Sequence, residues 1–195
     1  MLHKLSPLIL LVAVILLSET KHMTQADSPN SLLKISDKGI ELIKKFEGYR
    51  DKAYLCAGGQ WTIGWGSTIV KGTRVQQGDS VTAPIALDAL KTHLDTRTCP
   101  SIIKHVKSPL SQLQFDALCS FIYNTGEGGL RYYSSTSKTF KDTQVKQKLN
   151  AQDYKGAADA LLSWDKVSQN GKMVPLAGLT TRRKEERTLF LEGTV

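Results

Sequence analysis

The segment Phe46–Thr68, which reads FEGYRDKAYLCAGGQWTIGWGST, constrains the fold of this chain more than any other stretch. It begins where an amphipathic helix should end, because Gly48 is a natural helix stop. A Gly-Gly turn follows, and strand-forming residues on either side predict a β-hairpin with strands over Ala53–Cys56 and Thr62–Trp65. The chain must therefore pass directly from a helix into a small antiparallel lobe.

Three side chains of this segment can carry chemistry. Glu47 lies at the helix end beside Phe46 and Tyr49, while Cys56 and Thr62 lie on the two sides of the turn. Cleavage of a glycoside needs a protonated carboxyl on the leaving oxygen and a second group that handles a water molecule. Partial burial beside the two aromatic rings is expected to raise the pKa of Glu47 and keep it protonated near neutral pH.

Each of these residues also has a structural interpretation. Glu47 can form a surface ion pair with Lys44 or Arg50. Cys56 can belong to a disulfide or fill a small apolar space. Thr62 can be an ordinary β-branched strand residue whose hydroxyl makes a local hydrogen bond. Residue type alone does not choose between these interpretations and the catalytic one.

The order and spacing of three motifs favour the catalytic interpretation. The spacing Glu-x8-Cys-x5-Thr resembles the catalytic triad of the phage-type lysozymes and endolysins, glycoside hydrolase family 24. Ser111–Gly128, SQLQFDALCSFIYNTGEG, is similar to that family's Gln-x-x-Phe-Asp-Ala-Leu…Asn-x-Gly segment. Gly178–Leu191, GLTTRRKEERTLFL, resembles its terminal Gly-Leu-x-x-Arg-Arg…Glu signature. The resemblance runs from about Ser36 to Gly193.

This resemblance implies that Glu47 is the general acid and that Thr62 holds the attacking water. Cys56 stands where the family more often has Asp, and a thiol with an ordinary pKa of about 8.5 is a poorer base at neutral pH. Its role as base, water-positioning group or transient nucleophile stays open. Asp51 is the nearest other carboxylate and the alternative second group.

The second motif implies substrate contacts for Gln114, Phe115 and Asn124, or packing between lobes. For Asn124, a hydrogen bond to an N-acetyl group and a capping role before Gly126 are equally compatible with the sequence.

The third motif places Arg182 and Arg183 on the last helix, where one of them is expected to pair with an acidic residue such as Glu186. Sugar stacking is a further possibility for the tryptophans, with Trp164 favoured as a core residue.

The remaining periodicity predicts an α+β fold that is mostly helical. The expected helices cover Ser36–Glu47, Thr82–Thr98, Ser111–Tyr123, Thr143–Asn150, Tyr154–Trp164 and Thr180–Leu191, and Pro100 should interrupt the second. The order of elements gives a small hairpin lobe, a long connecting helix and an all-helical lobe. A cleft between the two lobes is what the resemblance implies.

The first 27 residues differ from the rest. Two basic residues precede an apolar run over Leu8–Leu17, which is shorter than the ~20 residues of a membrane span and typical of a secretory signal. Cleavage before Asp27 and retention as a signal-anchor are both compatible with the composition. We therefore expect residues 1–27 to be an export segment, residues 28–195 to form the catalytic domain, and the domain to act outside the cytoplasm.

A net charge of +8 over 195 residues favours a polyanionic partner. The chain lacks a nucleic-acid-binding signature, so nucleic acid is disfavoured and peptidoglycan glycan strands are the expected partner. Histidines are scattered and no Cys-x2-Cys pair occurs, so neither a metal nor an organic cofactor is expected. We expect a monomer, with membrane contact only through the N-terminal segment.

Three cysteines leave an odd count in an exported protein. A Cys99–Cys119 bridge would leave Cys56 free for catalysis and stabilise the fold by ~3 kcal/mol. A disulfide that includes Cys56, and three free thiols, are the alternatives.

The sequence thus predicts an exported muramidase that cleaves the β-1,4 bond between N-acetylmuramic acid and N-acetylglucosamine. A lytic transglycosylase and a non-hydrolytic, cationic wall-binding or membrane-disrupting protein are the rival interpretations.

Overall fold

The computed structural model describes residues 27–56 and 58–194. The predicted export segment lies outside these residues, except for Asp27. Within the described part of the chain, no helix is long and apolar enough to span a bilayer.

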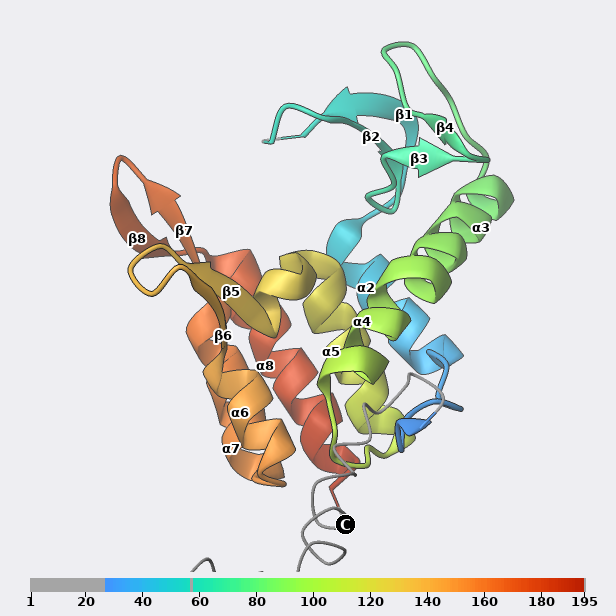
Figure 1. The fold of residues 1–195 in the computed structure, drawn as a ribbon. Helices are drawn as coiled ribbons and strands as arrows, with labels where there is room; N and C mark the ends of the chain where they lie inside the picture. The colour runs from blue at the N-terminus through green and yellow to red at the C-terminus, as the bar shows by residue number, and fades with distance from the viewer. Residues whose placement is uncertain (1–26, 57, 195) are drawn as a thin grey trace, which may run out of the picture.

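The small lobe begins where the first described helix ends (Figure 1). Helix α2 covers Asp37–Glu47, and the β1 strand Arg50–Leu55 pairs antiparallel with β2, Trp61–Gly64. A second, shorter pair consists of β3, Ile69–Val70, and β4, Thr73–Arg74. The predicted passage from helix into hairpin is confirmed.

A long helical run joins this lobe to the helical lobe, as expected. It comprises α3, Ala83–His93, a π-helical segment over Leu94–Thr98, and α4, Cys99–His105. The α-helix is interrupted just before Pro100, as predicted, but by a π-helical segment and not by a break in the helical run. The N–H of Cys99 bonds to the carbonyl of Leu94, five residues back, and this widened turn lets the helix continue through a residue that lacks an N–H and crowds the preceding turn.

The helical lobe is built around α5, Gln112–Thr125, and α8, Ala177–Glu192, which pack against each other. A 3-10 turn, Gly126–Gly129, follows α5. Helix α6, Gln144–Asn150, packs against α7, Tyr154–Leu161, which in turn packs against α8, and a 3-10 turn over Leu162–Trp164 extends α7.

This lobe also carries two hairpins that the sequence analysis did not predict. Strand β5, Arg131–Ser134, pairs with β6, Thr139–Asp142, and β7, Lys166–Gln169, pairs with β8, Lys172–Pro175. The lobe is therefore mostly helical rather than wholly helical. The α+β class with a small hairpin lobe is confirmed.

Two hydrophobic clusters form the core, one in each lobe. The larger surrounds α5, whose Phe115, Leu118 and Phe121 have no exposed surface. The smaller joins Ile43 of α2 and Ile63 of β2 to the connecting helix. Trp164 packs edge-on against Phe121 with ring centroids 5.6 Å apart, so its predicted core position is confirmed, although it is only half-buried.

Asp116 of α5 fixes the start of α2. Its carboxylate accepts hydrogen bonds from the backbone N–H of Ser36, at 2.8 Å, and from the Ser36 hydroxyl. Ser36 is the N-cap residue as predicted, but its hydroxyl bonds to Asp116 rather than to its own helix. This contact holds α2, and therefore Glu47 at its other end, against the helical lobe.

All three cysteines are free thiols. The buried sulfur atoms of Cys99 and Cys119 are 3.8 Å apart, so the two segments meet as proposed, but the predicted bridge between them is not formed. Burial raises the pKa of Cys119, while the hydrogen bond with Cys119 lowers that of Cys99. Cys56 is not in a disulfide either.

Candidate active site

Glu47 is the last residue of α2 and its carboxyl is partly exposed. Gly48 ends the helix with a positive φ of 66°, which turns the chain toward β1. The Glu47 side chain retains 21% of its accessible surface, and its Oε1 accepts a hydrogen bond from Nη1 of Arg182 at 2.7 Å. A half-buried carboxyl with one oxygen fixed by a cation is thus placed between the two lobes.

The two surface ion pairs considered for Glu47 do not form. Lys44 instead pairs with Glu41 at 2.6 Å, and the guanidinium of Arg50 lies 4.8 Å from the ring of Tyr54. Glu47 therefore does not form a local ion pair with Lys44 or Arg50. Its partner is Arg182, which lies 135 positions further along the chain.

Hydrogen bonds to Glu186 and Ser120 fix the side chain of Arg182, which also contacts Glu47. Its Nε donates to Glu186 at 3.0 Å, and its Nη2 donates to the carbonyl of Ser120 at 3.0 Å. Its guanidinium also lies 5.5 Å from the ring of Phe46. The expected pairing with Glu186 is confirmed, but the direct contact with Glu47 was missed, since no local pattern connects α8 to the end of α2.

Arg183 carries the same network to Asn124. It is fully buried, pairs with Glu186 at 2.9 Å, and donates to Asn124 Oδ1 at 3.0 Å. Burial lowers the pKa of Arg183 to about 10, against the opposing effect of Glu186, and burial raises the pKa of Glu186. Because the Asn124 carbonyl oxygen is engaged, its exposed amide group remains available as a donor.

Gly66 and Tyr123 surround the second oxygen of Glu47. Gly66 has φ of 87°, and a Cβ built there would lie 3.3 Å from Glu47 Oε2 and 3.3 Å from the Tyr123 hydroxyl. That hydroxyl donates to the carbonyl of Trp65 at 2.7 Å. Burial, and then the nearby Glu47, raise the pKa of Tyr123. Sequence reasoning missed both residues, although three glycines around Trp65 marked an irregular backbone.

Cys56 and Thr62 meet at the β1–β2 turn. The backbone N–H of Cys56 donates to Gln60 at 2.9 Å, which closes the turn. Hydrogen bonds from the backbone of Gln60, from the Thr62 hydroxyl and from the backbone of Gly58 lower the pKa of Cys56. Thr62 is buried, and its hydroxyl also lies 3.1 Å from the carbonyl of Gln60. The structure therefore brings the predicted thiol and hydroxyl into contact.

Tyr54 connects this pair to Glu47. It lies directly opposite Thr62 in the β1–β2 register, so the two side chains share one face of the hairpin. Burial raises the pKa of Tyr54; Arg50 lowers it, and the charges of Glu47 and Cys56 raise it. Glu47 and Cys56 are thus both near the same phenol. The three predicted catalytic residues lie around Tyr54, which the sequence analysis had not singled out.

Two of the predicted substrate contacts have structural positions instead. Gln114 is buried in a capping box with Ser111, whose backbone N–H donates to its Oε1 at 2.9 Å. Phe115 has no exposed surface and belongs to the core. Neither side chain is open to a glycan in this conformation, so of the three only Asn124 remains a candidate.

The tryptophans and Asp51 add little to the site. Trp65 is buried and packs against Tyr49 with ring centroids 4.9 Å apart, so it cannot stack on a sugar without moving. Trp61 is half-buried, and Asp51 is exposed on β1. No group of three or more histidine, cysteine or acidic side chains in the described residues is placed to bind a metal ion.

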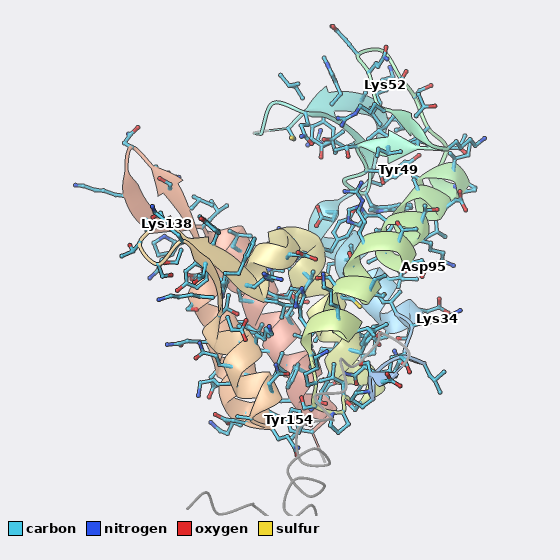
Figure 2. All side chains as sticks on the ribbon, viewed as in Figure 1. Lys34, Tyr49, Lys52, Asp95, Lys138 and Tyr154 are labelled. Atoms are coloured by element: carbon cyan, nitrogen blue, oxygen red, sulfur yellow. The ribbon has the colours of Figure 1, made fainter. Side chains whose placement is uncertain are left out.

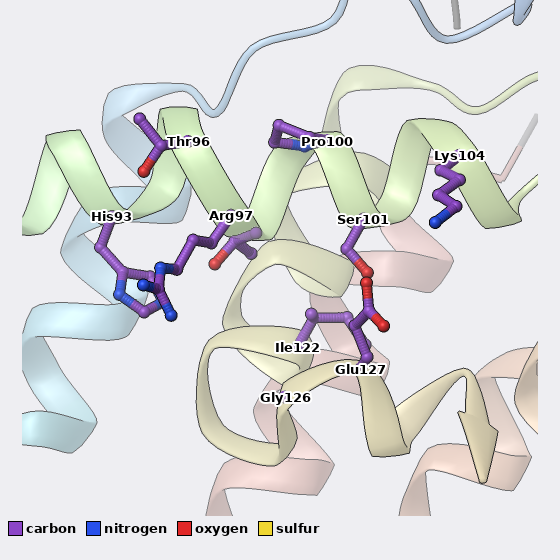
Figure 3. Close-up of a pocket in the computed structure, with 10 residues that line it drawn as sticks. His93, Thr96, Arg97, Pro100, Ser101, Lys104, Ile122, Gly126 and Glu127 are labelled. Atoms are coloured by element: carbon purple, nitrogen blue, oxygen red, sulfur yellow. The ribbon is translucent and has the colours of Figure 1, made fainter. Parts of the chain in front are cut away.

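A cavity of about 520 Å³ lies apart from the predicted catalytic residues (Figure 3). Its lining includes His93, Arg97 and Lys104 of the connecting helix and Glu127 of the turn after α5. The ring of His93 packs 5.0 Å from that of Tyr123. Glu47, Cys56 and Thr62 are not among the residues that line this cavity, so the glycosidase chemistry is not assigned to it.

Comparison with known proteins agrees with this geometry. The family model described as phage lysozyme matches residues 44–186, which include Glu47, Cys56, Thr62 and Arg182. The chain belongs to the phage lysozyme family. An endolysin of Acyrthosiphon pisum secondary endosymbiont phage 1 is 37% identical over 158 residues, which cover 81% of this chain and 98% of that protein.

Solved structures of other family members have the same fold. An endolysin from Escherichia coli O157:H7 phage FAHEc1 aligns with this protein at a TM-score of 0.70 and 33% identity, covering 83% of this chain and 95% of the other. The active form of the P1 phage endolysin Lyz aligns at 0.68 and 29% identity, over 85% and 89% of the two chains. Its secreted inactive form aligns at only 0.51 and 25% identity, over 83% and 98%. The conformation described here is thus more similar to the active form of that relative.

Proposed function

We propose that this protein is a peptidoglycan hydrolase that cleaves the β-1,4 bond between N-acetylmuramic acid and N-acetylglucosamine. The observation that carries the proposal is the position of Glu47. One oxygen is fixed by Arg182 at 2.7 Å and the other lies beside Gly66, which has no side chain to cover it. This arrangement presents a single carboxyl oxygen to a glycan that lies between the lobes.

In the proposed mechanism, Oε2 delivers the proton. Oε1 accepts a hydrogen bond from the guanidinium of Arg182 and is engaged in that contact, which leaves Oε2 as the oxygen available to the substrate. From there Glu47 protonates the glycosidic oxygen as the bond breaks. Arg182 orients the carboxyl, and Glu186 and Ser120 hold Arg182 in place.

Cys56 and Thr62 handle the water. The Thr62 hydroxyl and two backbone groups lower the pKa of the Cys56 thiol, so the thiolate that can accept a proton from water is populated at lower pH than for an ordinary cysteine. The arrangement suits attack on the sugar face opposite Glu47. The exposed amide of Asn124, held by Arg183, is placed to donate to an N-acetyl carbonyl.

The substitution Glu47→Gln tests the proposal. It keeps the shape of the side chain and removes the acidic proton, so release of reducing ends from purified sacculi should fall by about 10²–10⁴-fold. Glu41→Gln on the same helix is the matched control, because Glu41 is exposed and forms an ion pair with Lys44 on the protein surface. Near-native activity of Glu47→Gln would remove Glu47 from the mechanism.

Product analysis separates the hydrolase from its rivals. A hydrolase adds water and leaves a free reducing end, whereas a transglycosylase leaves a 1,6-anhydro sugar that is lighter by one water. Contact between Thr62 and Cys56 favours water as the attacking group. A protein that binds walls without changing their mass spectrum would instead be a binding protein. On the composition of its first 27 residues, we propose that the protein acts outside the cytoplasm.

A further inference from the structure

The β5–β6 hairpin carries an aromatic surface that the catalytic proposal does not use. Tyr133 and Phe140 lie directly opposite each other in the register, with ring centroids 5.5 Å apart in an edge-to-face contact. They retain 58% and 61% of their surface. The guanidinium of Arg131, on the same face, lies 3.9 Å from the ring of Phe140. We call the face formed by Arg131, Tyr133 and Phe140 the hairpin platform.

Contacts within the hairpin platform fix the orientation of its side chains. The edge-to-face pair and the arginine stack hold both rings in one orientation, and neither ring belongs to a core cluster. A contiguous patch of exposed aromatic residues marks an interaction surface more often than a single exposed aromatic residue does. The Arg131 guanidinium lies over the ring of Phe140, so the platform also carries a positive charge.

The hairpin platform follows closely in the chain on the end of α5, which carries residues of the proposed catalytic site. Strand β5 begins directly after the 3-10 turn that follows α5, and the end of α5 carries Tyr123 and Asn124. Figure 1 shows the hairpin at the end of the helical lobe that faces the β1–β2 pair. Lys138, in the turn of the hairpin, lies at the outer edge of this lobe in Figure 2.

The composition of the hairpin favours a glycan over a lipid surface. Residues 131–142 contain five serine or threonine residues and no aliphatic side chain. Insertion into a bilayer interface requires apolar side chains that enter the acyl region. Aromatic rings flanked by hydroxyl groups suit a sugar instead, because the C–H face of a pyranose packs on a ring while its hydroxyls form hydrogen bonds.

Charge adds a second element of complementarity. Five basic residues and one acidic residue lie in the two hairpins of the helical lobe, residues 131–142 and 166–175. The hairpins therefore have a net charge of +4. This is half of the chain's net charge of +8, in 22 of its 195 residues. The single acid, Asp142, already pairs with Lys146. The stem peptides of peptidoglycan carry carboxylates along the strand, and Arg131 on β5 and Lys138 in the turn supply positive charge on the same hairpin.

We propose that the hairpin platform binds a glycan strand of peptidoglycan outside the catalytic site, with the sugar faces on Tyr133 and Phe140 and a stem-peptide carboxylate on Arg131. This inference rests on the proposed function for its choice of substrate. The platform holds the enzyme on the insoluble wall while the bond is cleaved elsewhere.

Binding to purified sacculi, measured by co-sedimentation, tests the proposal. All proteins carry Glu47→Gln so that the wall stays intact. Tyr133→Ala combined with Phe140→Ala should weaken binding about tenfold, as expected for loss of aromatic anchors. Tyr132→Ala is the matched control: Tyr132 is a tyrosine of the same strand, 49% exposed, on the opposite face. It should bind like the parent, and thermal unfolding confirms that all variants are folded.

A second arm tests the carboxylate. Arg131→Gln should weaken binding to intact sacculi about threefold and leave binding to strands stripped of stem peptides by an amidase unchanged. An equal effect on both substrates would contradict the assignment of Arg131 to a carboxylate.

Three outcomes would overturn the platform. The first is equal binding by the Tyr133 and Phe140 double variant and the parent, and the second is failure of the parent to bind sacculi. The third is binding to phosphatidylglycerol vesicles that depends on Tyr133 and Phe140 while sacculus binding does not, which would assign the face to a membrane surface. Failure of the hydrolase proposal has a separate readout: native protein would release no reducing ends, whatever the hairpin variants do.

Discussion

At the scale of single residues, the site depends on contacts that differ in kind. In the proposed mechanism, Cys56 acts through the lowered pKa of its sulfur, whereas Gly66 acts through the absence of a side chain. Each role predicts a different measurable effect of substitution. These effects distinguish a residue with only a structural role from one that takes part in the reaction.

The pH profile of kcat/KM should identify the base. If the Cys56 thiolate accepts the proton, activity rises with pH through the pKa of Cys56, which lies below its ordinary value. Cys56→Asp should stay active and move this rising limb to lower pH by several units, because a carboxyl loses its proton near pH 4. Cys56→Ala should lose most activity. A rising limb that stays in place in the Asp variant would show that another group is the base.

Gly66→Ala should reduce activity at least tenfold and lower the free energy of unfolding by about 1–3 kcal/mol. The new Cβ would be strained at φ of 87° and would press on Glu47 Oε2 and the Tyr123 hydroxyl at 3.3 Å. Gly72→Ala is the control, since Gly72 has φ of 79° with nothing within 4 Å. The control should show the conformational cost in urea unfolding but keep its activity. Equal loss of activity in both variants would point to backbone strain alone.

At the scale of elements, α2 is positioned by the close approach of α5. Gly39 leaves room for this contact, because a Cβ there would lie 2.7 Å from Ile35 Cγ1 and 2.9 Å from Asp116 Cβ. The backbone at Gly39 is helical, so the need for glycine is steric and not conformational.

Gly39→Ala should therefore destabilise the protein by about 1–3 kcal/mol, although alanine is the better helix former. Gly178→Ala, in the first turn of α8 with nothing within 4 Å, provides the opposite case and should be neutral or stabilising by about 0.5 kcal/mol. Thermal and urea unfolding of the two variants check the signs. A stabilising Gly39→Ala would mean that α2 shifts freely away from α5.

At the scale of the whole molecule, one buried ionic network joins α2, α5 and α8. Glu186 has no exposed side-chain surface and pairs with both Arg182 and Arg183, which in turn reach Glu47 and Asn124. The network links the proposed catalytic acid at the end of one helix to the proposed substrate donor at the end of another.

Glu186→Gln should lower the free energy of unfolding by about 3–5 kcal/mol, because it leaves the buried guanidinium of Arg183 without its counter-charge and removes one of the two carboxylates that pair with Arg182. Glu192→Gln removes the exposed pair with Lys38 and should cost less than about 1 kcal/mol. Urea unfolding compares the two. A similar small cost for both would show that water reaches Arg183 in the native state.

The sequence by itself determined the local features of this protein and the order in which they occur. The stop at Gly48, the turn at Gly58-Gly59 and most of the helices follow from backbone preferences and periodicity within a few residues. The three motifs with their spacing indicated Glu47, Cys56 and Thr62 as a group. The two hairpins of the helical lobe were missed because their strands are short and largely exposed, and so lack the alternation that marks a strand.

Only the tertiary structure decided which distant side chains complete the site. Arg182 reaches Glu47 across 135 positions, and the Gly66 backbone approaches both Glu47 and Tyr123. The π turn that carries the helix through Pro100, and the burial of Gln114 and Phe115, likewise depend on how α5 packs against its neighbours. The physical reason is that local preferences act over one or two turns of chain, whereas ion pairs and steric contacts depend on distances that only the packed lobes set.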